Sequence, residues 1–77
     1  NKRTIMELIA SDRPGLLSIV GRLFVEFDIY IETAKIVTVG ERAEDVFYLT
    51  NLRGGPLSEK SSKLLRDKLI QSVDNQI

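Results

Sequence analysis

Apolar and polar side chains alternate at the start of the chain, between Thr4 and Ala10. One parity holds Met6, Leu8 and Ala10, and the other holds Ile5, Glu7 and Ile9. A period of two is typical of a β-strand, because successive side chains of a strand point to opposite faces. Since both parities are mainly apolar, we expect a well-covered strand here.

Between Pro14 and Phe27 the apolar spacing changes to that of a helix. The apolar positions recur three or four residues apart, at Leu16, Val20, Leu23 and Phe27, with Leu17 and Phe24 beside them. This stripe predicts an amphipathic helix. Gly21 interrupts it at a cost of about 1 kcal/mol relative to alanine. We therefore expect something to approach closely at Gly21, with tight packing inside the domain favoured over a ligand or another chain.

Residues 29–39 are rich in β-branched side chains, which predicts a second strand. Their apolar parity shifts, from Ile29 and Ile31 to Ala34 and Ile36. The shift predicts a bulge or twist near Thr33. A polar connection at residues 40–43 is suited to a hairpin, and residues 44–50 return as a third strand.

Residues 51–56 have the composition of a loop, and a second helix is predicted after them. Ser58 is suited to cap this helix, which should run to about Val73. Its buried stripe should be Leu65, Leu69 and Val73, with Leu64 beside them. The basic residues of the same segment are most simply a solvated face.

The order strand, helix, strand, strand, helix predicts an α+β fold of ferredoxin-like plan, βαββα, in a single domain over residues 1–77. We expect one antiparallel sheet with both helices on one face. The predicted core places Met6, Leu8, Phe47 and Leu49 beneath Leu16, Val20, Leu65 and Leu69. The fourth strand of this plan is missing or contributed from elsewhere, which should leave an edge of the first strand unpaired. Preceding residues of a longer protein, or another copy of the domain, are the candidates to cover it.

Composition narrows the classes of function. The chain has no cysteine and no histidine, so the usual zinc ligands and the usual general base are missing, and we predict no metal, no cofactor and no catalytic residue. Glu44 and Asp45 should point to opposite faces of their strand, so they do not form an acid–base pair. Eleven basic and eleven acidic residues are interspersed, which argues against nucleic acid and membrane surfaces. No membrane span or signal peptide is evident, so we expect a cytoplasmic domain with a small neutral or zwitterionic ligand.

The predicted ligand-binding site joins the first strand to the first helix. Its residues are Asp12, Arg13, Pro14, Gly15, Leu16 and Leu17. Pro14 suits the first helical position, and Gly15 removes a side chain where the first free amides emerge. The amides of Gly15, Leu16 and Leu17, together with the helix dipole, could hold a small carboxylate or carbonyl. The same residues are ordinary helix-start signals, so a purely structural role stays open.

The strand, the turn Asp-Arg-Pro-Gly-Leu-Leu and the helix, in a ferredoxin-like order, resemble the ACT family of regulatory domains, which sense amino acids and other small metabolites. The resemblance covers nearly the whole chain. Gly15 matches the glycine of the first strand–helix loop, near which these domains bind ligand at a domain–domain interface. A second stretch, residues 34–36 followed by residues 40–48, is similar to the C-terminal ACT domains of the bifunctional PII uridylyltransferase/uridylyl-removing enzymes.

The resemblance implies regulation rather than a reaction. In those enzymes the ACT pair is associated with glutamine sensing, while transfer of UMP to the nitrogen-signalling protein PII, and its removal, take place in other domains. It implies glutamine as the ligand, a second ACT domain or a second copy as partner in a homodimer, and PII as a partner only through the parent enzyme. An alternative is a dimerisation or interdomain module that binds no ligand. An RNA-recognition sheet is disfavoured, because the first strand offers no aromatic side chain for base stacking.

Overall fold

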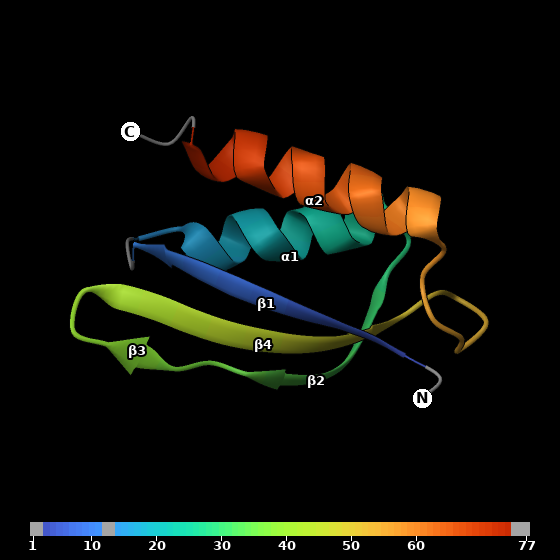
Figure 1. Cartoon of the computed structure of the whole chain (residues 1–77), viewed down its shortest axis with the longest axis horizontal. Helices are drawn as coiled ribbons and strands as arrows, with labels where there is room; N and C mark the ends of the chain where they lie inside the picture. Colours follow the sequence, from blue (N-terminus) through green and yellow to red (C-terminus); the bar gives the residue numbers. More distant parts are fainter. Residues whose placement is uncertain (1–2, 12–13, 75–77) are drawn as a thin grey trace.

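The computed structural model describes residues 3–11 and 14–74. Its elements are β1 (Thr4–Ser11), α1 (Leu16–Glu26), β2 (Tyr30–Lys35), β3 (Thr38–Val39), β4 (Arg42–Thr50) and α2 (Glu59–Asp74). Both helices lie on one side of the sheet (Figure 1). The predicted α+β, ferredoxin-like arrangement is confirmed.

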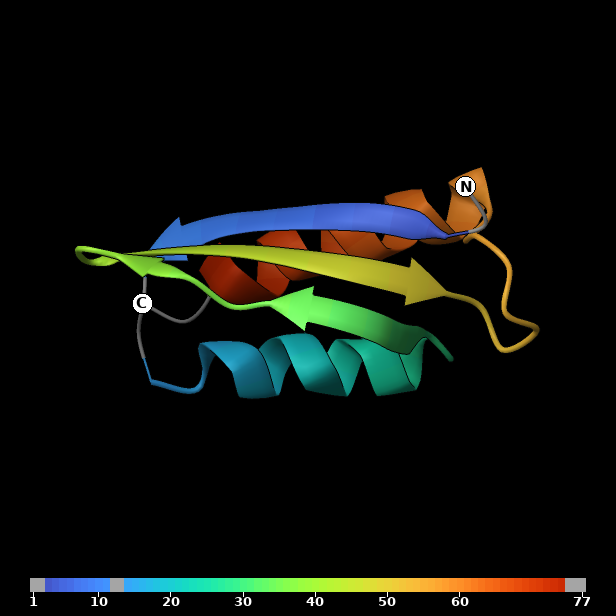
Figure 2. The ribbon, with the colours of Figure 1, turned by 90° about the horizontal axis from the view of Figure 1, so that it is seen from below.

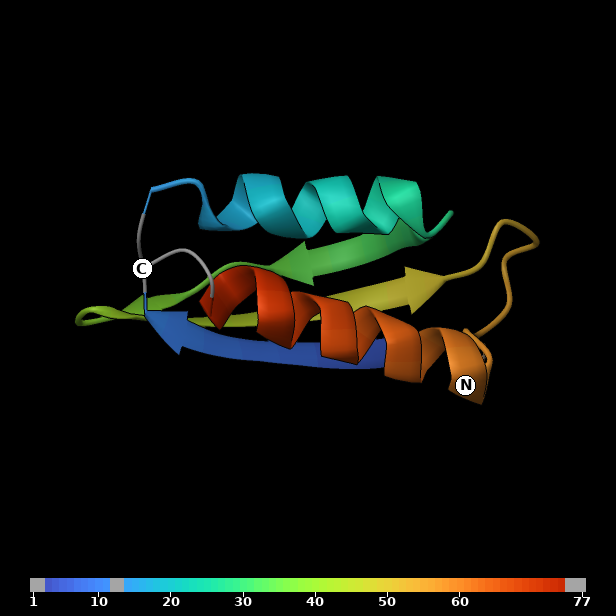
Figure 3. The same ribbon diagram turned by 90° about the horizontal axis from the view of Figure 1, so that it is seen from above.

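The central strand is β4, which pairs with β1 on one side and with β2 and β3 on the other. All of these pairings are antiparallel. Seen from the side without helices, β4 runs between β1 and β2 (Figure 2). Seen from the opposite side, α1 lies over the β2 side and α2 lies over β1 (Figure 3). Within the described part of the chain no strand pairs with the outer edge of β1, as the sequence predicted.

The strand predicted over residues 29–39 is irregular at two places. Ile31 pairs with Leu49 and Thr33 pairs with Tyr48, so Glu32 is an extra residue and the predicted irregularity near Thr33 is confirmed. A second interruption, which the sequence did not predict, separates β2 from β3 at residues 36–37.

That second interruption is made by the side chain of Asp45. The Val37 carbonyl accepts the expected cross-strand bond from the Glu44 amide at 2.9 Å. The Val37 amide instead donates to Oδ1 of Asp45, at 3.2 Å. A carboxylate oxygen therefore takes the place of a backbone acceptor at this point of the ladder.

The hairpin between β3 and β4 is tighter than predicted. Val39 pairs with Arg42, so the connection is only Gly40 and Glu41, and β4 begins two residues before the predicted Glu44. Gly40 has a φ of 64°. Glycine at the first position of a two-residue turn supplies the positive φ that such a turn needs, and this allows pairing to begin at once.

The core lies between β4 and the two helices. It comprises Val20, Leu23, Phe24, Ile29, Phe47, Leu49, Leu65 and Leu69. The rings of Phe24 and Phe47 meet edge to face, with centroids 5.3 Å apart. Phe47 and Leu49 are buried as predicted, but Met6 and Leu8 are only half-buried and pack at the margin of this core. Among the described residues no strand pairs with the outer edge of β1 to complete their cover.

The second helix starts and packs nearly as the sequence predicted. Ser58 caps it, since its Oγ accepts from the Ser61 amide at 3.1 Å. Leu65 and Leu69 are buried, whereas Val73 is half-buried. The helix therefore buries the first part of its predicted stripe more completely than its end.

Gly21 in α1 has no tight contact. An ideal Cβ built on this glycine meets no atom within 4 Å. The prediction that the domain packs tightly against Gly21 is therefore wrong, and this side of α1 is open in the single chain.

Candidate functional site

The loop between β1 and α1 contains the predicted site, but α1 begins later than predicted. Gly15 is the N-cap residue, and Leu16 rather than Pro14 is the first helical residue. Gly15 has a left-handed backbone, with φ 84°, which cannot continue a right-handed helix. Its carbonyl accepts the first intrahelical bond, from the Ile19 amide at 3.0 Å. The amides of residues 16–18 therefore have no intrahelical acceptor, so the predicted amides of Leu16 and Leu17 are joined by that of Ser18.

The N-cap residue of α1, Gly15, has no side chain with which to cap these amides. Among the described residues no side chain caps them, and the first turn holds no acidic residue. Backbone N–H groups at a helix start carry partial positive charge and bind small anions. An ideal Cβ on Gly15 meets nothing within 4 Å. Glycine is thus required here by its φ, and the space beside it is open.

The predicted site residues contribute in different ways. Asp12 and Arg13 lie outside the described residues. The exposed members are Pro14, Gly15 and Leu17. Leu16 is only 3% exposed, so its side chain belongs to the core and only its backbone amide remains for a ligand. Among the described site residues, the groups that can bind a ligand are therefore backbone amides.

Asp45 is a polar group that the sequence prediction missed. It is 1% exposed and faces the helices, while Glu44 lies on the other face and pairs with Arg42. The opposite orientation of Glu44 and Asp45 was predicted correctly. The missed signal was parity: position 45 falls in the buried series Ala43, Asp45, Phe47 and Leu49.

The carboxylate of Asp45 is incompletely satisfied. Oδ1 accepts from Val37, but Oδ2 is buried without a hydrogen-bond partner among the described residues. Asp45 pairs with Leu8, and Ser11 at the end of β1 pairs with Arg42. It therefore lies in the half of β4 that is nearer to the end of the sheet where β1 passes into the α1 loop. An unpartnered buried acceptor is costly, which is why such groups often mark functional sites.

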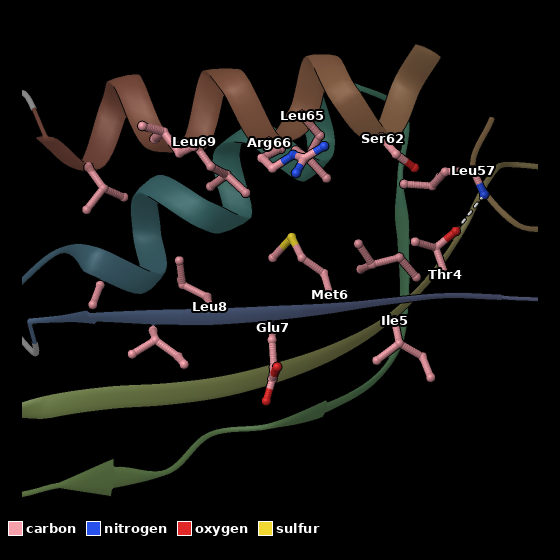
Figure 4. A pocket seen from close by; sticks show the side chains of 15 residues that line it. Thr4, Ile5, Met6, Glu7, Leu8, Leu57, Ser62, Leu65, Arg66 and Leu69 are labelled. Carbon is pink, nitrogen blue, oxygen red and sulfur yellow. Dashed lines mark hydrogen bonds between the residues drawn. The ribbon is translucent and has the colours of Figure 1, made fainter. Parts of the chain in front are cut away.

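A separate groove of about 500 Å³ runs between β1 and α2. Met6 and Leu8 point into it from the strand, toward Leu65, Arg66 and Leu69 of the helix (Figure 4). At one end the Leu57 amide donates to Oγ1 of Thr4, at 2.9 Å. This groove lies along the unpaired edge of β1, where the fourth strand of a complete ferredoxin-like sheet would pack.

The described residues hold no group of three or more acidic side chains placed to bind a metal ion. No helix in the described part of the chain has both the length and the apolar character needed to cross a bilayer.

Comparison with known proteins gives close relatives. No model of a known protein family matches the chain. The chain is 51% identical over 76 residues to the bifunctional uridylyltransferase/uridylyl-removing enzyme of Vibrio campbellii, covering 99% of the chain and 9% of that protein. The enzyme of the same name from Vibrio cholerae is 53% identical over 72 residues, which is 94% of the chain and 8% of that protein. That of Pseudomonas syringae pv. syringae is 45% identical over 71 residues, 91% of the chain and 8% of that protein. The chain is thus homologous to a segment that makes up less than a tenth of these enzymes.

Proposed function

We propose that this chain is an ACT-type regulatory domain of a cytoplasmic bifunctional uridylyltransferase/uridylyl-removing enzyme, and that it binds an amino acid, with glutamine the first choice. The domain itself performs no reaction. It passes the nitrogen status of the cell to catalytic domains elsewhere in the enzyme, and so reaches the PII protein only through them. The observation that carries the proposal is the start of α1, where the N-cap is a glycine and the amides of residues 16–18 have no intrahelical acceptor.

An amino-acid zwitterion suits this end of the sheet, because the helix start carries partial positive charge and the carboxylates near it carry negative charge. The carboxylate or side-chain carbonyl of the amino acid accepts from the amides of residues 16–18, which lack intrahelical acceptors. Asp12 attracts the ammonium group, and the buried carboxylate of Asp45 adds negative charge at the same end. A facing strand from a second domain closes the pocket. A sensor of an abundant metabolite needs only a dissociation constant near millimolar, about −4 kcal/mol, which a few hydrogen bonds provide.

The test is a glutamine titration of the 77-residue chain and of the enzyme that contains it, followed by calorimetry and by NMR of backbone amides. We expect shifts centred on Gly15 and the residues that follow it. In Gly15→Val the signal should disappear, because a side chain now occupies the open approach and strains the turn. The same titration with glutamate as a competing ligand tests whether the site is specific for glutamine.

Gly54→Val is the matched control for backbone strain. Gly54 also has a φ of 84° and open space around its ideal Cβ. It lies in the loop after β4, at the other end of the sheet from the start of α1 (Figure 1). We expect Gly54→Val to lose similar stability and to keep glutamine binding. Equal binding losses in the two folded variants would contradict a site at Gly15.

The second candidate is a dimerisation or interdomain module that has this fold and binds no ligand. The observation in its favour is the open apolar groove along β1. The same titration separates the two: an enzyme that responds to glutamine without any shift in the α1 loop senses it in another domain.

A further inference from the structure

The sheet face that carries no helix, here called the outer face, is partly apolar. Its apolar members are Ile5, Ile9, Val39, Val46 and Tyr48. Ile5 and Ile9 are each 61% exposed. Figure 2 views the molecule from this side, with no element of the chain in front of the strands. Both isoleucines lie on β1, two residues before and two residues after Glu7. A sheet face with exposed isoleucines at such positions is a candidate interaction surface.

Charges near the two ends of the outer face are already paired within the chain. At one end Arg3 forms an ion pair with the bulge residue Glu32, and its guanidinium stacks 5.0 Å from the centre of the Tyr48 ring. At the other end Arg42 pairs with Glu44. These charges therefore need no partner from another molecule.

The central row of the outer face differs, because its charges are unpaired. Glu7 and Lys35 both pair in register with Val46, so the row reads Glu7, Val46, Lys35 across three strands. Neighbouring strands are about 4.8 Å apart, which separates Glu7 from Lys35 by roughly 10 Å along the row, too far for an ion pair. Both are exposed, and neither has an ion-pair partner among the described residues.

This row is complementary to itself. When a second copy stacks on the outer face across a two-fold axis tilted by about 15° from β4, Val46 meets the partner's Val46, Glu7 lies over the partner's Lys35, and Lys35 lies over the partner's Glu7. A two-fold axis running across the strands would instead place Glu7 over the partner's Glu7 and Lys35 over the partner's Lys35, so that like charges face each other. Packed sheets lie about 10 Å apart with strand directions about 30° apart, and at the centre of the face the Glu and Lys side chains span that distance.

We propose that the outer face is a self-docking surface, on which two copies stack sheet to sheet with reciprocal Glu7–Lys35 ion pairs around a Val46 centre. Glutamine takes no part in this contact. The face is small, so we expect a weak dimer with a micromolar dissociation constant.

Charge reversal tests the proposal by sedimentation equilibrium of the 77-residue chain, with circular dichroism to confirm folding. Glu7→Lys and Lys35→Glu should each weaken the dimer about tenfold or more, because two symmetric contacts become repulsive. The double variant should dimerise like the wild type. Glu26→Lys and Lys63→Glu, on exposed positions of α1 and α2, make the same charge changes away from the face and should have little effect.

Mixing the two single variants identifies the contact as one between chains. Each variant alone opposes like charges, whereas a mixed pair restores both Glu–Lys contacts, so the heterodimer should form more strongly than either homodimer. A strictly monomeric wild type, a dimer indifferent to Lys35→Glu, or a mixture no tighter than its components would each overturn the proposal. Indifference to Lys35→Glu would indicate pairing through the edge of β1, because Lys35 lies on β2 at the other side of the sheet.

Discussion

The neighbouring strands β4 and β1 have the same alternation but different burial. The helix-facing residues of β4 are Ala43, Asp45, Phe47 and Leu49, all of them buried. The helix-facing residues of β1 are Thr4, Met6, Leu8 and Ala10, all of them half-buried. In the part of the chain that the structure describes, β4 has a strand on each side, whereas β1 has one on a single side. Periodicity thus predicts which face a residue occupies, while burial depends on neighbours that periodicity does not specify.

The two helices also differ in how many of their apolar residues are buried. α1 buries Leu16, Val20, Leu23 and Phe24 within eleven residues. α2 is longer, with sixteen residues, and its buried apolar residues are Leu65 and Leu69, while Leu64 and Ile70 are more than half exposed. We call the buried region between α1 and β4 the closed half, and the groove between β1 and α2 the open half. β2, at the sheet edge on the α1 side, is exposed throughout. A segment that covers the open half therefore has the most apolar surface to gain.

Leu49→Ala should cause the largest loss of stability. Leu49 is 0% exposed on the central strand, so truncation leaves a cavity that neighbouring residues cannot fill. The expected decrease in the free energy of unfolding is about 3–5 kcal/mol, which is enough to unfold much of a domain this small. Urea denaturation followed by circular dichroism measures it. A loss below about 1 kcal/mol would show that the closed half is loosely packed.

Leu8→Ala makes the same chemical change on the same face of the sheet, in the open half. Both residues line the groove, but Leu8 is only half-buried whereas Leu49 is fully buried, so we expect a smaller loss, about 1–2 kcal/mol. The difference between the two losses in the free energy of unfolding measures how much less completely Leu8 is packed than Leu49. If Leu8→Ala costs as much as Leu49→Ala, and the cost grows with protein concentration, the groove is occupied by another copy in solution.

Much of the fold could be predicted from the sequence because local signals agreed with the final packing. Alternation defined β1 and β4, helical spacing defined α1 and α2, and the parity shift located the bulge near Thr33. The half-burial of Met6 could not be predicted from its own segment, since it depends on the outer edge of β1, with which no strand of the described residues pairs. The break between β2 and β3 depends on the Asp45 side chain from another strand.

The candidate site was predicted only in part. The pattern around Pro14 and Gly15 correctly located a helix start, but Pro14 was assigned to the helix because proline favours the first helical position. The left-handed backbone of Gly15 moved that start to Leu16. Asp45 was missed because a carboxylate on a strand is usually exposed, although its parity with Phe47 and Leu49 predicted a buried position. Whether glutamine binds here stays a prediction.

Ser58→Ala should have the smallest effect of the three, and it tests how the two helices are anchored. The first helical residue of α1, Leu16, is itself buried, whereas the first buried residue of α2 is Leu65, six positions after Glu59. The start of α2 therefore depends on the Ser58 hydroxyl that accepts from the Ser61 amide. Losing this cap should cost about 1 kcal/mol and speed hydrogen exchange at Ser61, while Ser58→Asp, which keeps an acceptor, should restore most of the loss. If exchange at Ser61 is unchanged in Ser58→Ala, the first turn of α2 is held by packing instead, and the open half is more ordered at that end than its burial indicates.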